Sequence, residues 1–129
     1  MPAPASATYS VAALVAAHTA FRDLIDGGPG AGFISIRSAA DVLLATINMA
    51  DPCGTVNGAT GRLTFSIPGG DTVSTSGTAA YGEFCDSTGA VHLALPAQEG
   101  LSAVSGKIVL NTLSLVVGGP LDVVLANVG

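Results

Sequence analysis

Charged side chains are scarce in this sequence. Asp, Glu, Lys and Arg make up 10% of the 129 residues, whereas about 25% is usual for a soluble domain. One folded domain of this length has a surface of roughly 6,200 Å², so small and aliphatic side chains must cover large areas between the charges. A surface of this kind tends to associate. The composition therefore indicates burial in an assembly, with an ordinary domain rich in Ala and Gly as the alternative.

Positive charge is especially rare, which excludes two classes of partner. The fixed cations are Arg22, Arg37, Arg62 and Lys107, which lie far apart in the sequence, and the net charge is −5. Binding of nucleic-acid phosphates or of an anionic membrane surface requires clustered Lys and Arg. We therefore expect no nucleic-acid partner and no membrane partner.

Long apolar runs are missing too. The most apolar stretch, residues 108–128, is interrupted by Asn, Thr, Ser, Gly, Pro and Asp, so it does not predict a transmembrane helix. Residues 1–6 contain no basic residue, which makes the apolar run 11–17 a poor signal peptide. We expect synthesis in a cytoplasm.

Only two cysteines occur, Cys53 and Cys85. In a protein made in a cytoplasm they are expected as thiols that behave as small buried hydrophobes, with a disulfide between them as the alternative. No histidine lies near either cysteine in the sequence, so they do not predict a metal site. We expect neither a metal nor a cofactor.

Motifs of catalysis are lacking as well. His18 falls on the apolar face of a predicted helix and is expected in a core or an interface, whereas His92 alternates with alanines on the solvent or partner side of a predicted strand. Nucleophilic catalysis requires a nucleophile oriented by a base and a third group, and no such pattern is present. The glycine-rich stretch 27–32 follows a helix, whereas a phosphate loop precedes one. We predict no catalytic residue and no enzyme activity.

Two segments precede the β-rich part of the chain. Residues 1–7 are rich in Pro and Ala and predict a flexible arm, which leaves residues 8–129 as a single domain. Ser10 is a suitable helix N-cap, and apolar residues follow it at helical spacing up to Ile25. Gly27 then predicts the end of this helix.

The remainder predicts strands separated by turns. The expected strands are 33–37, 42–48, 62–67, 78–85, 90–95, 107–117 and 121–128, with loops at 50–61 and 96–106. Turn sequences such as Asp86-Ser87-Thr88-Gly89 separate them. About seven strands with this spacing are typical of an antiparallel sandwich or a small barrel. We therefore predict a mainly β domain with one N-terminal α-helix.

Three stretches carry a resemblance to a known family: 33–48, 76–81 (Ser-Gly-Thr-Ala-Ala-Tyr) and 85–91 (Cys-Asp-Ser-Thr-Gly-Ala-Val). The chain resembles, over about residues 18–128, small proteins encoded in the virion-structure modules of tailed phages and prophages. Members are similar in a short N-terminal helix, a first strand of the form I-x-I-x-S, a Gly-Thr-Ala strand, an Asp-Ser-x-Gly hairpin and a final apolar pair. They more often carry an aromatic residue where Ala80-Tyr81-Gly82 stands here.

The resemblance implies a non-enzymatic particle component present in many copies, either a head decoration (cement) protein or a tail-associated protein, located in the virion. Expected partners are the chain itself and virion proteins such as the major capsid protein or tail proteins. A trimer is favoured only by analogy with β proteins on threefold sites of shells. The alternative function is a receptor- or glycan-binding module at a tail or fibre tip, although Tyr9 and Tyr81 are the only tyrosines and Trp is absent. We also expect residues 1–7 to order in the assembly and to contribute to subunit contacts, with a frayed terminus as the alternative.

Overall fold

The computed structural model describes residues 9–102, 104, 106–121 and 123–128, and these form one α-helix and ten β-strands. The elements are α1 (Val11–Asp26), β1 (Phe33–Arg37), β2 (Leu43–Asn48), β3 (Gly54–Val56), β4 (Leu63–Phe65), β5 (Gly77–Thr78), β6 (Tyr81–Cys85), β7 (Val91–Glu99), β8 (Ile108–Leu110), β9 (Ser114–Leu115) and β10 (Val123–Val128). A mainly β fold with one N-terminal helix is therefore confirmed. The expected arm, residues 1–7, lies outside the described residues.

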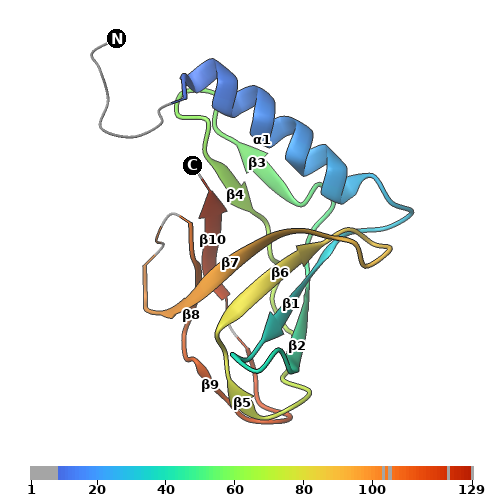
Figure 1. Cartoon of the computed structure of the whole chain (residues 1–129), viewed down its shortest axis with the longest axis vertical. Helices are drawn as coiled ribbons and strands as arrows, with labels where there is room; N and C mark the ends of the chain where they lie inside the picture. The colour runs from blue at the N-terminus through green and yellow to red at the C-terminus, as the bar shows by residue number, and fades with distance from the viewer. Residues whose placement is uncertain (1–8, 103, 105, 122, 129) are drawn as a thin grey trace.

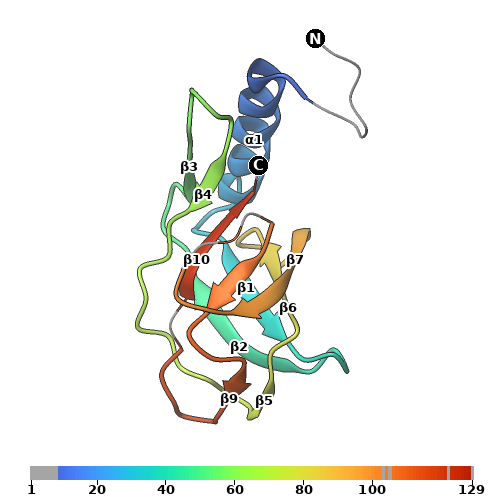
Figure 2. The same ribbon diagram turned by 90° about the vertical axis from the view of Figure 1, so that its left-hand side faces the viewer.

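Eight of the strands form one curled sheet. Its order is β2-β1-β6-β7-β8-β10-β4-β3, while β5 and β9 pair separately. The sheet closes to about half a barrel, as Figures 1 and 2 show. All ladders are antiparallel except the one between β7 and β8. This parallel pair was not expected from the hairpin-like spacing of the sequence.

The core fills the concave side of the curled sheet. Phe65 of β4 and Phe84 of β6 pack with ring centroids 4.4 Å apart, and Phe21 of α1 meets Phe65 edge-on at 6.5 Å. The largest fully buried side chains otherwise come from Ile25, Ile34, Ile36, Leu44, Ile47, Leu63, Ile108, Val109, Leu110 and Cys53. The alternation predicted for the strand 62–67 is confirmed, because Leu63 and Phe65 are buried and Ile67 packs against the core.

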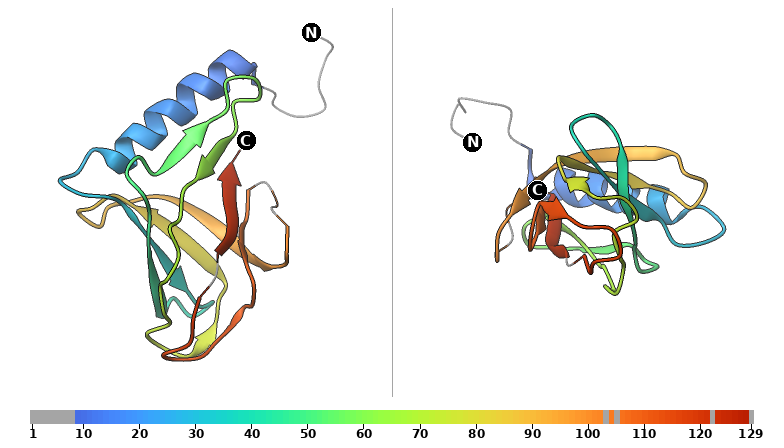
Figure 3. Two further views of the ribbon diagram at one scale, coloured as in Figure 1. Left: turned by 180° about the vertical axis from the view of Figure 1, so that it is seen from behind. Right: turned by 90° about the horizontal axis from the view of Figure 1, so that it is seen from below.

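Helix α1 lies across one end of the half-barrel, beside the β3–β4 hairpin (Figures 1 and 3). The side chain of Ser10 accepts a hydrogen bond from Ala13 N, and the helix ends at Gly27, so the predicted cap and stop are confirmed. Only Ile25 of the helix is fully buried, while Val11 and Leu24 are exposed. The apolar stripe is thus only partly covered, because α1 packs mainly on two three-residue strands. No helix of the described part of the chain is long and apolar enough to cross a membrane.

Four predicted elements differ in the structure. The expected loop 50–61 contains β3, whose Thr55 pairs with Thr64. The predicted strand 78–85 is divided into β5 and β6, because Ala79 N donates to Leu113 O and Ala80 N donates to Arg37 O, so the chain changes neighbours there. The predicted strand 107–117 is likewise divided into β8 and β9.

The expected loop 96–106 is also wrong in its first part, because β7 continues through Pro96 to Glu99. Ala97 N donates to Ala80 O on the β6 side. The nitrogen of Pro96 therefore points to the other side of the strand, where the β8 ladder begins only at Ala97. The missing N–H costs no ladder hydrogen bond at that position, which explains why a proline is tolerated inside this strand.

Candidate functional site

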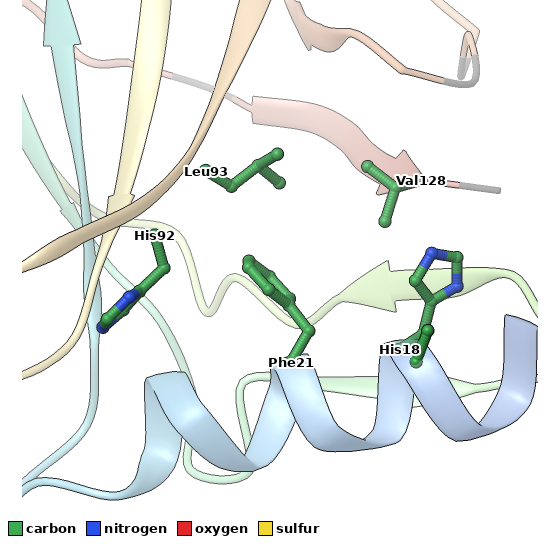
Figure 4. Close-up of a pocket in the computed structure, with 6 residues that line it drawn as sticks. His18, Phe21, His92, Leu93 and Val128 are labelled. Carbon is green, nitrogen blue, oxygen red and sulfur yellow. The ribbon is translucent and has the colours of Figure 1, made fainter.

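An apolar groove of about 340 Å³ lies between α1 and the strands that face it. Its lining residues are Ala17, His18, Phe21, His92, Leu93 and Val128. In Figure 4, Phe21 stands between the two imidazoles, and Leu93 of β7 and Val128 of β10 face the helix from across the groove. The groove exists because the β3–β4 hairpin covers only part of the apolar face of α1. The rest of that face is half-buried and borders the groove.

A β-bulge turns His92 toward this groove. Cys85 pairs with Val91 and Phe84 pairs with Leu93, so His92 is an extra residue without a partner on β6. Bulges bend a strand and redirect side chains. His92 is consequently only 20% exposed, so of the two expected surroundings, solvent or a partner, free solvent does not fit, and a partner side stays a prediction.

Asp86 holds the imidazole of His92. Nε2 of His92 lies 2.9 Å from Oδ2 of Asp86, while Oδ1 of Asp86 accepts from the hydroxyl of Thr88 at 2.5 Å and from the backbone N–H groups of Thr88 and Ala90. The hydroxyl of Thr88, followed by His92, holds the pKa of Asp86 well below its usual range. Residues 86–89 form the predicted turn. In the structure the carboxylate of Asp86 in this turn also orients the imidazole of His92.

His18 links α1 to the β3–β4 turn. Its Nδ1 lies 2.5 Å from the carbonyl oxygen of Gly61, and because a carbonyl only accepts, Nδ1 carries the proton. Gly61 has a φ of +76°, and a Cβ at this position would lie 2.4 Å from Cβ of Leu14. The helix and the turn are therefore in close contact, and His18 is half-buried at an interface between elements, as its place on the apolar face predicted.

The lining of the groove is mostly apolar and suits the binding of an apolar partner. None of its six lining residues carries a hydroxyl, thiol or carboxylate group. The two histidines are held by a backbone carbonyl and by Asp86, and no nucleophile is hydrogen-bonded to either imidazole among the described residues. Among those residues there is also no cluster of His, Cys, Asp or Glu suited to a metal ion. An apolar occupant fits this lining best.

A second apolar surface lies at the end of the half-barrel remote from α1, where Figure 1 places β5 and β9. Four large aliphatic side chains are exposed here: Val42, Leu43, Val116 and Val117, of which Val116 is 65% and Val117 59% exposed. We call these four residues the apolar end.

Segment 72–76 joins the two halves of the apolar end. Ser74 N and Thr75 N donate to Leu44 O on one side, and Gly118 N donates to Val73 O on the other. Val117 N donates to the hydroxyl of Ser76 at 2.8 Å. The exposed valines and leucine therefore stand on a hydrogen-bonded framework and not on isolated loops.

This end of the molecule is almost free of charge. The segments 42–50, 72–82 and 108–121, which build it, contain no charged residue. The flanking Asp41 is tied to the side chains of Arg37, at 3.8 Å, and Tyr81. Arg37 also pairs with Glu83 at 2.5 Å, and its hydrogen bond with Glu83 raises the pKa of Arg37. Of the charges that flank these segments, Asp41 and Glu83 are thus both paired with Arg37, whereas Asp71 accepts a hydrogen bond from the side chain of Asn48.

Cys53 and Cys85 are buried and free. Burial, followed by the charge of Asp26, raises the pKa of the Cys53 thiol to about 12, and burial also raises the pKa of Cys85. Both therefore stay protonated near neutral pH, as expected of structural thiols.

No family model, curated protein or solved structure matches this chain.

Proposed function

We propose that this protein is a non-enzymatic structural subunit of a tailed-phage particle, present in many copies as a head decoration or tail-associated protein. The sequence resemblance suggests the class of particle. In this proposal the chain is made in the bacterial host cytoplasm and becomes part of the virion.

The observation that carries the proposal is the apolar end. Two adjacent valines, each about three-fifths exposed, stand in a region whose three building segments lack charge. Exposed apolar surface without interspersed charge is a feature of contact sites and is unfavourable for a chain that stays monomeric. We infer that this end packs against further copies of the same chain, and that the resulting oligomer attaches to other virion proteins.

Light scattering of the purified chain and of Val117→Asp tests the self-association. An aspartate at a buried contact must lose its hydration without a partner, so we expect the association constant to fall at least tenfold. Val91→Asp is the matched control, because Val91 is 49% exposed but lies at the start of β7, outside the apolar end. Equal effects of both substitutions, or a monomer at every concentration, would contradict the inferred contact.

A further inference from the structure

We propose that the apolar groove between α1, β7 and β10 receives residues 1–8 of a neighbouring copy of the chain. This inference rests on the proposed function, because it names the contact by which neighbouring subunits hold one another. It concerns a different surface from the apolar end.

The chemistry of the segment matches that of the groove. Residues 1–8 read Met-Pro-Ala-Pro-Ala-Ser-Ala-Thr and contain no charged side chain. Phe21, Leu93 and Val128 give the groove an apolar floor, and the imidazoles of His18 and His92 flank Phe21 (Figure 4). Extended proline-containing segments bind to aromatic-lined grooves of this type, because the prolines restrict the free chain and little entropy is lost on binding.

The size of the groove also favours a short segment of chain. A volume of about 340 Å³ is near the lower limit of small-molecule sites, which range over roughly 300–1,000 Å³. The groove runs between α1 on one side and Leu93 of β7 and Val128 of β10 on the other (Figure 4). Small side chains such as Ala and Pro can lie close to α1 there, next to the small side chain of Ala17.

The reach of the segment distinguishes a neighbour's arm from the molecule's own. Ser10 has the extended backbone usual for an N-cap, with φ −65° and ψ 157°, so residues 1–8 are not a continuation of α1 in sequence register. Twelve residues separate Tyr9 from Phe21, or about 18 Å along the helix axis. Eight extended residues span about 25 Å, but a reversal takes about four of them and leaves roughly 12 Å. At this length the molecule's own residues 1–8 could reach Ala17 and His18 at the near end of the groove but not Phe21, whereas those of a neighbour could lie along the whole groove.

Mixing two full-length variants, each with one added cysteine, tests this arrangement. Ala3→Cys is prepared with ¹⁵N and mixed with unlabelled Ala17→Cys under mild oxidation, and mass spectrometry identifies disulfides between labelled and unlabelled chains. The native Cys53 and Cys85 are buried, and the mass of the linked peptides distinguishes them from the added thiols. Ala94→Cys is the matched control partner, because Ala94 is exposed on β7 next to Leu93 but does not line the groove.

We expect the disulfide that joins position 3 of one chain to position 17 of another to form at least fivefold more than the disulfide between positions 3 and 94. Equal yields of these two linkages would overturn the proposal. A double variant, Ala3→Cys with Ala17→Cys, that links only within one chain would overturn it as well.

A second measurement separates this proposal from the proposed function. Ala17→Glu should weaken association, and Ala16→Glu, an exposed neighbour outside the groove, should not. If light scattering shows association that Val117→Asp abolishes while no linkage between positions 3 and 17 forms, the arm proposal fails and the proposed function stands. A chain that never associates contradicts both.

Discussion

Replacement of Gly61 by alanine should separate α1 from the β3–β4 turn. Gly61 has a φ of +76°, and a Cβ there would lie 2.4 Å from Cβ of Leu14, a side chain that cannot move without the helix. A left-handed conformation costs a non-glycine residue about 1–2 kcal/mol, and overpacking adds about 1–3 kcal/mol. We expect Gly61→Ala to lower the free energy of unfolding by about 2–5 kcal/mol.

Two other glycines separate these contributions. Gly69 also has a positive φ, +88°, but a Cβ there meets nothing within 4 Å, so Gly69→Ala should lose about 1–2 kcal/mol from the backbone alone. Gly58 lies in the same turn as Gly61, with neither a positive φ nor a neighbour within 4 Å. Gly58→Ala should be neutral or stabilising by up to about 1 kcal/mol, because alanine restricts the unfolded chain.

Urea unfolding followed by circular dichroism measures all three variants on one scale. The expected order of stability is Gly58→Ala, then Gly69→Ala, then Gly61→Ala. Equal losses for Gly61→Ala and Gly69→Ala would show that Leu14 does not press on the turn. A Gly61→Ala variant as stable as Gly58→Ala would refute the described packing of α1 altogether.

The ionisable groups give further expected outcomes. Cys53 and Cys85 should react slowly with a thiol reagent in the native protein and give two thiols per chain in urea, whereas fewer than two would indicate a disulfide. Because the pKa of Cys53 is raised to about 12, its contribution to the free energy of unfolding is complete below about pH 9 and should be lost as the pH rises from about 9 to 12. In Cys53→Ser this part of the pH dependence of stability should be absent. The lowered pKa of Asp86 contributes stability above about pH 4 that is lost as the pH falls. Asp86→Asn should therefore be less stable than the parent at about pH 7, and a difference that persists unchanged at about pH 2 would contradict this assignment.

Much of the fold could be predicted from local patterns. The helix follows from Ser10, the apolar spacing and Gly27, and the β1–β2 pair follows from two strand-like runs on either side of the turn sequence 38–41. These signals are local in the sequence, so they survive in the folded protein. The parallel β7–β8 pair depends on which strand lies beside which after folding, and no local pattern encodes that.

The groove could not be predicted for a similar reason. The sequence places His18 on a helix and His92 on a strand, and the bulge that turns His92 toward the helix depends on the register between β6 and β7. Only the Asp-x-Thr turn sequence before His92 could have pointed to Asp86 as its partner, and Val128 had no signal at all. The apolar end was anticipated only as a general property of the composition, since the sequence does not show which uncharged segments gather at one end.

Quantitative mass spectrometry of purified phage particles tests the proposed function most directly. Particles from the phage or prophage that encodes this chain are purified, and the amount of the chain is measured relative to the major capsid protein. A structural subunit should be present in many copies per particle and in a constant ratio through successive purification steps. Absence from the particles, or a ratio that falls with each step as for a host contaminant, would contradict the proposed role.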